Sequence, residues 1–241
     1  STAVTTATED AAYTYTVTAS DADGDSLTMT GTTVPSWLSF NAATGVLSGT
    51  PANANVGTSG NAVVITVSDG NNGAVTDSFT ITVANTNDAP TVANAISDAS
   101  TDEDAAYSLS ISNVFTDVDS GDSCTYTMSG APSTITLSST TISGTPVNAD
   151  VGTHTIVVTC TDGSSASVSD SYILTVANTN DAPTLASAIA DASTAEDASY
   201  SLDVSSVFTD VDSGDTLTYT ISGAPSSLSI SSGTISGAPV N

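Results

Sequence analysis

The chain of 241 residues contains no lysine and no arginine, although it carries 26 aspartate and glutamate residues. Its formal net charge is therefore −26, and no acid can pair with a lysine or an arginine. Nucleic-acid phosphates and anionic membrane surfaces are bound through basic side chains. We therefore expect no nucleic-acid partner, and partners that are neutral, basic or bridged by a metal ion.

Catalytic signatures and long apolar runs are also missing. No apolar run approaches the ~20 residues of a membrane span, so we expect no membrane insertion by this segment. His154 is the only histidine, and we interpret it as a surface strand residue. No Gly-x-Ser-x-Gly nucleophile motif occurs. The acidic pairs recur in every repeat, which fits an architectural role better than catalysis, so we predict that the chain is not an enzyme.

Two cysteines in 241 residues are too few for a disulfide framework. Cys124 takes the place of Leu27 and Leu217 in the sister repeats, and Cys160 takes the place of Val67. Both positions therefore face the core. The pair either forms one bridge between neighbouring strands or stays free and buried.

An internal repeat is the clearest feature that is present. Asn-Thr-Asn-Asp-Ala-Pro occurs at residues 85–90 and 178–183, a step of 178 − 85 = 93 residues. The flanking landmarks return in the same order, which indicates a tandem array. We predict module 1 at residues 1–88, module 2 at 89–181 and an incomplete module 3 at 182–241. Module 3 lacks counterparts of the last two strands, so we expect a longer array or completion by a neighbouring molecule.

Period-two runs rich in Thr, Val, Ile and Tyr predict strands at 13–17, 63–67 and 79–83, with equivalents at 107–111, 155–160 and 172–176. No run of comparable length has a helical period. About seven short strands in each module of ~93 residues are typical of an immunoglobulin-like β-sandwich. We therefore predict an all-β chain, with Trp37, Leu38 and Phe40 in the core of module 1.

The acids gather in recurring clusters. Each module has a Glu-Asp pair, at residues 9–10, 103–104 and 196–197, and a second cluster follows it at 21–25, 117–122 and 210–215. Crowded like charges repel unless a cation lies among them. A divalent metal explains the clustering, whereas a merely solubilising acidic surface does not predict it. An EF-hand at Asp21 is excluded, because Ser26 and Thr32 stand where that loop requires Gly and Glu.

These motifs resemble cadherin repeats. The strings Phe-Thr-Asp-Val-Asp-Ser-Gly-Asp and Ile-Ser-Gly-Thr-Pro are similar to those of the dystroglycan-type cadherin-like modules found in bacterial surface adhesins. The resemblance implies tandem immunoglobulin/cadherin-like sandwiches with calcium bound at each junction between modules. At the first junction it implies the ligands Glu9, Asn85, Asn87, Asp88, Asp117, Asp119 and Asp162. At the second it implies Glu103, Asn178, Asn180, Asp181, Asp210 and Asp212.

The match to cadherins is incomplete. Their acid-rich Leu-Asp-Arg-Glu motif is absent, and Asn55 and Asp150 are candidate substitutes in the segments that replace it. Asn and Ala also replace charged or amide residues of the linker, which lowers the ligand charge. We therefore expect one or two calcium ions per junction.

Two functions follow from the resemblance. In the first, the chain is a calcium-stiffened extender or stalk of an extracellular adhesin at the cell surface, and its partners are calcium and neighbouring modules. In the second, it is a subunit of an extracellular filament, in which strands of the next molecule complete module 3.

Overall fold

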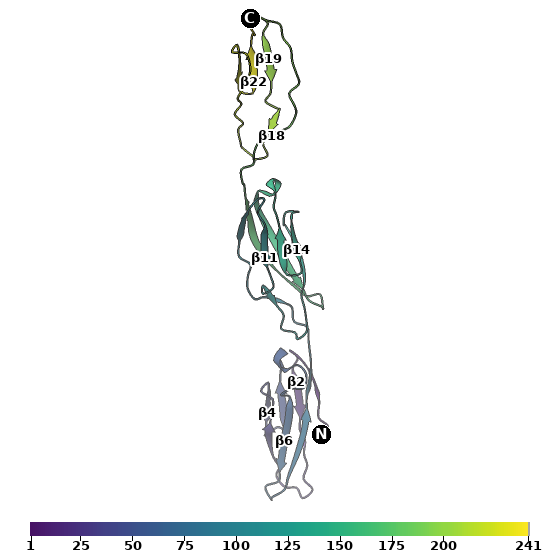
Figure 1. Ribbon diagram of the computed structural model, residues 1–241. Coiled ribbons are helices and arrows are strands. Elements are labelled where there is room, and N and C mark those ends of the chain that lie inside the picture. Colours follow the sequence, from purple (N-terminus) through teal and green to yellow (C-terminus); the bar gives the residue numbers. More distant parts are fainter. Residues whose placement is uncertain (241) are drawn as a thin grey trace. The chain divides into compact units, whose positions relative to one another are not determined.

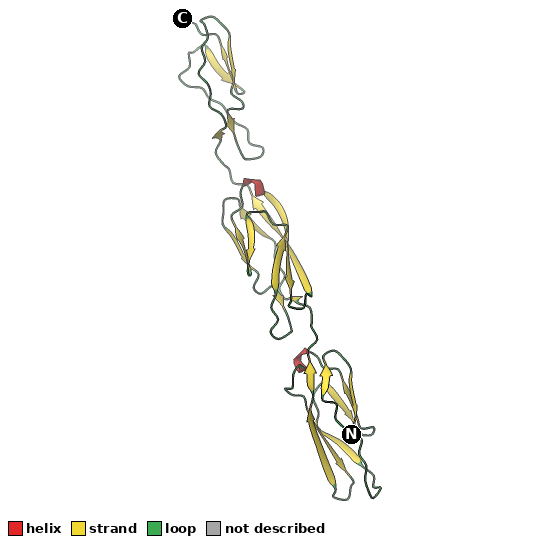
Figure 2. Ribbon diagram, turned by 90° about the vertical axis from the view of Figure 1, so that its right-hand side faces the viewer, coloured by secondary structure: helices red, strands yellow, loops and turns green. Residues whose placement is uncertain are grey.

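A computed structural model describes residues 1–240, which form strands, turns and two short 3-10 helices (Figures 1 and 2). No α-helix occurs among these residues, which confirms the predicted all-β class. The described part of the chain also contains no helix long and apolar enough to cross a membrane. By their contacts, Ser1–Asn94, Asn113–Tyr126 and Thr159–Ser169 form one compact unit, and the remaining described residues form a second.

Module 1 holds eight strands and one 3-10 helix, labelled in chain order. They are β1 (Thr6–Thr8), β2 (Tyr13–Thr16), β3 (Thr28–Thr33), β4 (Leu38–Asn41), β5 (Val46–Gly49), η1 (Asn53–Asn55), β6 (Ala62–Ser68), β7 (Ala74–Thr80) and β8 (Thr82–Ala84). One sheet has the order β2-β5-β4 and another the order β3-β6-β7, both antiparallel. β1 pairs in parallel with β8.

The core of module 1 lies between these sheets. The inward residues of both are buried because each strand alternates apolar and polar side chains. Leu47 of β5 and Val63 of β6 are fully buried, and Trp37 and Phe40 pack against this core beside buried Leu38. The predicted core residues are therefore confirmed, and the arrangement is a β-sandwich.

Module 2 repeats the plan with nine strands and a second 3-10 helix. They are β9 (Thr91–Val92), β10 (Ala99–Asp102), β11 (Tyr107–Ser110), β12 (Phe115–Thr116), β13 (Thr125–Ser129), β14 (Ile135–Ser138), β15 (Thr141–Gly144), η2 (Asn148–Asp150), β16 (Gly152–Thr161) and β17 (Ser167–Ala177). The sheets run β11-β15-β14 and β10-β17-β16-β13, and β9 pairs with β12.

The two cysteines of module 2 form a disulfide, Cys124–Cys160, with their Cα atoms 5.2 Å apart. Cys160 lies in β16 and is fully buried, and Cys124 immediately precedes β13, the neighbouring strand of the sheet. Of the two alternatives that the sequence leaves open, the bridge is therefore the one adopted.

The described part of module 3 contains β18 (Thr184–Leu185), β19 (Tyr200–Asp203), β20 (Phe208–Thr209), β21 (Leu228–Ser231) and β22 (Thr234–Gly237). β19-β22-β21 form an antiparallel sheet equivalent to β2-β5-β4, and β18 pairs with β20 as β9 pairs with β12. The repeat of the sequence is thus also a repeat of strand pairing.

Candidate metal-binding junctions

The linker after β8 brings three carboxylates together at the end of module 1. Ligand atoms of Glu9, Asp10 and Asp88 lie within 4.8 Å of one another. Glu9 is only 2% exposed, and its Oε2 accepts a hydrogen bond of 3.2 Å from the backbone N–H of Thr86. The backbone N–H of Glu9 itself donates to Ala84 at 2.9 Å. The linker therefore holds the carboxylate of Glu9, and β8 holds the backbone that carries it.

The turn at the Glu-Asp pair has the same backbone conformation in each module, although only Glu9 and Glu103 are buried. Asp10 has a φ of 58°, Asp104 of 58° and Asp197 of 59°. Aspartate enters this left-handed region more readily than most residues that have a side chain. The N–H groups of Asp10 and Asp104 donate to Pro51 and Pro146, each at 2.8 Å. The Glu-Asp pair is therefore held as a defined turn.

A second cluster lies at the facing end of module 2. Ligand atoms of Asp117, Asp119 and Asp122 lie within 4.8 Å of one another, and Asp119 is 6% exposed. The linker contacts this cluster directly, because the backbone N–H of Asp88 donates to Asp119 Oδ2 at 2.7 Å. The Asn53 amide of η1 donates to Asp119 Oδ1 at 3.0 Å. Asp119 is thus joined both to the linker and to module 1.

Asp162, in the turn after β16, completes this end of the first junction. Its Oδ1 accepts the backbone N–H groups of Ser164 at 2.9 Å and Ala166 at 2.8 Å. Its Oδ2 accepts the side-chain amide of Asn87 at 2.9 Å. The hydrogen bond from Asn87, together with those from the backbone, lowers the pKa of Asp162 and keeps it ionised.

The second junction repeats this geometry. Glu103, Asp104 and Asp181 form one cluster, and Asp210, Asp212 and Asp215 form the other. Asp181 N–H donates to Asp212 Oδ2 at 2.6 Å, and the Asn148 amide donates to Asp212 Oδ1 at 3.2 Å. The same linker-to-Asp and Asn-to-Asp hydrogen bonds thus occur at both junctions, which indicates that they are a regular feature of the repeat.

The clusters carry uncompensated negative charge. Partial removal from water, followed by the charge of Asp119 and its neighbours, raises the pKa of Asp88, and the pKa of Asp181 is raised in the same way beside Asp212. Glu103 is 2% exposed, and its Oε2 is buried without a hydrogen-bond partner, as is Oδ2 of Asp117. Buried carboxylate oxygens normally have a partner. Oxygen-only donor sets with free lone pairs fit a hard divalent cation such as calcium.

Most of the predicted site residues lie together at the junctions, but three asparagines do not. Clusters or direct hydrogen bonds unite ten of them, namely Glu9, Asn87, Asp88, Asp117, Asp119, Asp162, Glu103, Asp181, Asp210 and Asp212. Asn180 donates only to the backbone of Asp181, at 2.8 Å. Asn178 accepts a long contact of 3.5 Å from Asn148. Asn85 is exposed and takes part in none of the hydrogen bonds above.

The proposed substitutes for the acid-rich cadherin motif lie in their own turns. Asn55 Oδ1 accepts the N–H of Ala52 at 2.9 Å. Asp150 Oδ2 accepts the N–H of Val147 at 3.1 Å and the Thr134 hydroxyl at 2.6 Å. Two residues earlier, Asn53 and Asn148 reach the junction instead. Sequence reasoning missed this pair, although Asn recurs at that position in both modules.

Sequence reasoning also noted four acids of the clusters without assigning them to the sites. These residues are Asp10, Asp104, Asp122 and Asp215. Each follows an assigned acid by one to three residues, so proximity in the chain was the available signal. Partial removal from water and the charges of Asp117 and Asp119 raise the pKa of Asp122, which is consistent with its place in the cluster.

Comparison with protein families matches residues 1–84, 89–177 and 182–241 to the family described as "Putative Ig domain". The chain belongs to this Ig-domain family. Each matched range contains one copy of the repeat, so the Ig-domain fold accounts for nearly all of the sequence.

Among curated proteins, this Ig-domain chain is similar to the "Serine-rich adhesin for platelets" of Staphylococcus aureus. Identity to the protein of strain MRSA252 is 39% over 142 residues, which cover 58% of this chain and 10% of the adhesin. For strain MSSA476 the identity is also 39%, and 6% of the adhesin is covered. The chain thus spans a tenth or less of the length of these relatives.

Among solved structures, the Ig-domain repeats are similar to cadherins. Mouse cadherin-23 EC22-24 matches with a TM-score of 0.58 and 18% identity over 99% of this chain and 86% of that one. Protocadherin Gamma B2 extracellular cadherin domains 1–5 match with a TM-score of 0.58 and 16% identity over 98% of this chain and 51% of that one. At these identities the likeness concerns the fold, and it confirms the predicted cadherin-like sandwich.

Proposed function

We propose that this chain is an extender of an extracellular cell-surface adhesin whose junctions are stiffened by calcium. The observation that carries the proposal is the pair of carboxylate clusters at each junction, joined by the Asp88–Asp119 and Asp181–Asp212 hydrogen bonds. The adhesin relatives support a role in adhesion or projection, and the disulfide suits an extracellular location. The partners are calcium and neighbouring modules.

The module boundaries of this extender are proposed at residues 1–88, 89–181 and 182–241. The first two modules end directly after the Asn-Asp dipeptide of their linker, at Asp88 and Asp181. Each linker is therefore counted with the module that precedes it. The recurring acidic strings support the further proposal that the modules are of the dystroglycan-type cadherin-like kind. The recurrence of the same acidic clusters at both junctions supports an architectural, non-enzymatic role.

The two clusters of each junction suggest two non-equivalent ion positions. Glu9, Asp10 and Asp88 would hold an ion on the side of module 1, and Asp117, Asp119 and Asp122 would hold one on the side of module 2. A bound divalent cation would neutralise the like charges that crowd these groups. Asp88 contributes its carboxylate to one cluster and its N–H to the other, so the linker couples the two positions.

The physical consequence is a joint whose stiffness depends on the ion. Without a cation, the ionised clusters repel one another across the linker. With cations bound, the charge of both clusters is neutralised while Asp88 of the linker joins the two positions, and binding stabilises the joined state by mass action. The stalk is therefore expected to be stiff at extracellular calcium levels and slack where calcium is scarce.

A filament subunit is the second candidate. In module 3, Phe208 and the stretch Leu217–Thr220 line an exposed hollow of about 210 Å³, and Phe208 is 38% exposed. An added strand from another molecule would cover this apolar surface. Growth of mass with chain concentration distinguishes this candidate from the extender.

Small-angle scattering of the purified chain, with millimolar calcium and with excess chelator, tests the proposal. The extender predicts a monomer with a longer and narrower distance distribution in calcium. Asp119→Asn/Asp212→Asn should lose this response, whereas Asp77→Asn/Asp191→Asn, which removes two exposed acids outside the clusters, should keep it. Growth into long assemblies favours the filament, and indifference of the native chain to calcium contradicts the calcium junction.

A further inference from the structure

The linker of the first junction is held by two different turns of module 2. The N–H of Asp88 donates to Asp119 Oδ2 at 2.7 Å, and the Asn87 amide donates to Asp162 Oδ2 at 2.9 Å. Asp119 lies between β12 and β13, whereas Asp162 follows β16, and β13 and β16 are neighbouring strands of one sheet. The two hydrogen bonds can therefore form together only while the two turns keep a fixed separation.

The disulfide joins the strands directly beside these two turns. Cys124 stands two residues after Asp122, the last acid of its cluster, and Cys160 stands two residues before Asp162. The turns themselves also approach each other, because a Cβ atom on Gly163 would lie 3.9 Å from Asp122 Oδ1. Cys160 is fully buried, so the bridge is anchored in the core of module 2. It therefore limits how far the two turns can move apart.

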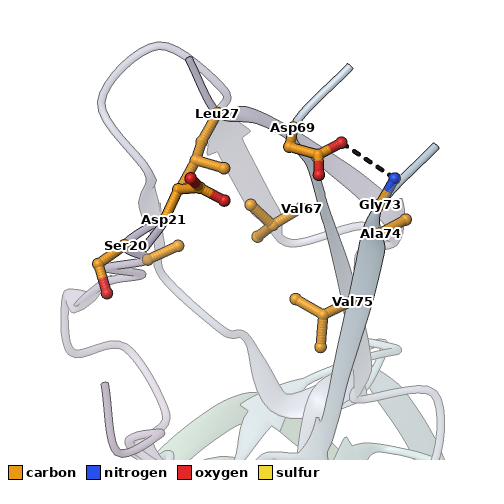
Figure 3. A pocket seen from close by; sticks show the side chains of 9 residues that line it. Ser20, Asp21, Leu27, Val67, Asp69, Gly73, Ala74 and Val75 are labelled. Atoms are coloured by element: carbon orange, nitrogen blue, oxygen red, sulfur yellow. Dashed lines mark hydrogen bonds between the residues drawn. The ribbon is translucent and has the colours of Figure 1, made fainter. Parts of the chain in front are cut away.

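Module 1 links its two corresponding turns without a covalent bond. Leu27 and Val67 occupy the cysteine positions and line one apolar hollow together with Asp69 (Figure 3). The side-chain amide of Asn71 donates to Asp25 Oδ2 at 2.8 Å and so joins one turn to the other. Asp25 stands two residues before Leu27, as Asp122 of module 2 stands before its cysteine. The link between the turns is thus present in both modules but differs in chemistry.

The residue that makes the hydrogen-bonded link is replaced in module 2. Ser164 takes the place of Asn71, since each is the second residue after the aspartate of its turn. A serine hydroxyl extends less far from the backbone than an asparagine amide. An exposed hydrogen bond also exchanges readily with water, whereas a disulfide opens only by exchange with a thiolate. Module 2 therefore has the more durable link exactly where its own amide link is missing.

We propose that the Cys124–Cys160 disulfide is a positioning element of the first junction, which holds the two turns at the separation that the linker requires. It keeps both aspartate acceptors within reach of the linker at once. By the same constraint it preorganises the carboxylates for a divalent cation, and this part rests on the proposed calcium function. Preorganised donors bind more tightly because less conformational freedom is lost on binding.

The test replaces the bridge by the residues of module 1, in Cys124→Leu/Cys160→Val, and follows amide hydrogen exchange of the whole chain by NMR in chelator. Exchange of one N–H reports the local opening of its hydrogen bond. The N–H of Asp88 should exchange several-fold faster than in the native chain, because its acceptor is held less firmly. The N–H of Asp181 makes the same contact at the second junction; its exchange should be unchanged, which makes it the internal control.

A third substitution separates positioning from core packing. Ser164→Asn, added to the Leu/Val variant, supplies the amide by which module 1 links its turns, and it should restore much of the protection of the Asp88 N–H. Ser165→Asn in the same background is the matched control. It copies Asn72 of module 1, and the backbone φ is positive at both positions, 76° at Ser165 and 66° at Asn72, but the link in module 1 comes from the preceding residue. Ser165→Asn should therefore restore nothing. Thermal unfolding followed by circular dichroism checks that all three variants fold.

Calorimetric titration with calcium chloride tests the part that rests on the proposed calcium junction. Loss of the bridge should weaken calcium binding at the first junction by about tenfold, as loss of groups that orient metal ligands commonly does. Ser164→Asn should recover part of this affinity. The sites of the second junction should keep theirs in all variants.

Three outcomes overturn the positioning role. They are unchanged exchange of the Asp88 N–H in the Leu/Val variant, equal acceleration at Asp88 and Asp181, and equal rescue by Ser164→Asn and Ser165→Asn. Unchanged calcium affinity at the first junction contradicts the preorganisation of the cation site. A native chain that binds no calcium but shows the expected exchange pattern would reject the calcium junction and leave the positioning role in place.

Discussion

The side-chain amide of Asn53 donates to Oδ1 of Asp119 across the first junction, at 3.0 Å. An amide donor compensates part of the charge of a nearly buried carboxylate, and Asn148 repeats the contact with Asp212. The contact also places the Asn side chain beside the proposed ion position. Asn53 is therefore a hydrogen-bond donor to Asp119, and in the proposed calcium junction it would also offer a neutral oxygen next to the ion.

Replacing Asn53 by Asp separates these two roles. In chelator, Asn53→Asp should lower the melting temperature, because it removes the donor and adds a charge beside Asp119. In calcium it should raise the affinity several-fold, because an added carboxylate increases the ligand charge. Differential scanning calorimetry and calorimetric titration with calcium measure the two effects.

The matched control for this change is Asn55→Asp. Asn55 stays in its own turn, and module 2 carries Asp150 at the equivalent position with the same backbone contact. Asn55→Asp should therefore leave calcium affinity unchanged. If both variants shift the affinity equally, Asn53 has no special place at the junction.

Glu103→Gln tests the buried glutamate of the second junction. Its Oε2 is buried without a partner and its Oε1 accepts the N–H of Thr179 at 2.8 Å. The neutral amide should weaken calcium binding there by about tenfold or more, yet it should not destabilise the chelated protein, since it removes a buried charge. Asp102→Asn, at an exposed neighbouring position, is the control and should change neither quantity.

Isothermal titration calorimetry with calcium measures this weakening. In Glu103→Gln, the sites of the second junction should bind calcium more weakly, while those of the first junction should keep their affinity. Unaltered binding at both junctions would exclude Glu103 as a ligand. A large drop in melting temperature in chelator would instead indicate that the ionised form of Glu103 stabilises the fold.

The repeat made much of this architecture predictable, because strand alternation places Leu38 and Val67 inward whatever the partner strand is. The resemblance to cadherin repeats also implied that Glu9 and Asp88 lie at one junction, and their carboxylates do lie close together. The hydrogen bonds of Asn53 were not predictable. Whether a 3-10 turn directs its first or its third residue to a neighbouring module depends on backbone geometry, which composition does not encode. Ion binding itself stays a prediction.

The short strands show a second limit. Parallel pairing of β1 with β8 joins residues about 75 positions apart, and Thr-Ala-Thr of β1 carries no pattern that predicts it. In the same way, equivalence to Leu27 and Val67 predicted that the two cysteines lie inward. It did not predict their bond, because the same positions hold apolar side chains in module 1.

The raised pKa values of Asp88 and Asp181 predict a pH dependence of the chelated chain. A carboxyl group whose pKa is raised on folding opposes folding when ionised, and this penalty disappears as pH falls through the raised pKa. The chelated protein should therefore gain stability as pH falls from neutral toward the ordinary Asp value of 3.8. Further acidification should then reverse the gain, because the pKa values of Asp162 and Asp150 are lowered and their stabilising effect is lost below the ordinary Asp value of 3.8.

Urea unfolding in chelator across this pH range measures the effect. Asp88→Asn/Asp181→Asn removes the two linker acids whose pKa is raised and should flatten the rise in stability between neutral pH and the ordinary Asp value of 3.8. Asp98→Asn, which removes an acid outside the four clusters, should retain the rise. Stability that falls steadily from neutral pH would contradict repulsion at the junctions.

The disulfide predicts a specific weakness of module 2. Cys124 and Cys160 are 36 residues apart in sequence, and loss of a bridge of this kind usually costs about 2–4 kcal/mol of unfolding free energy. Cys124→Ser/Cys160→Ser should lose this amount and also place two hydroxyl groups at inward positions. Cys124→Leu/Cys160→Val restores the residues of module 1 and should recover part of the loss through apolar packing. Urea unfolding with and without reductant compares the stability of the three chains. The reductant should destabilise only the native chain. If the Leu/Val variant is no more stable than the Ser variant, these positions do not pack as their counterparts in module 1 do.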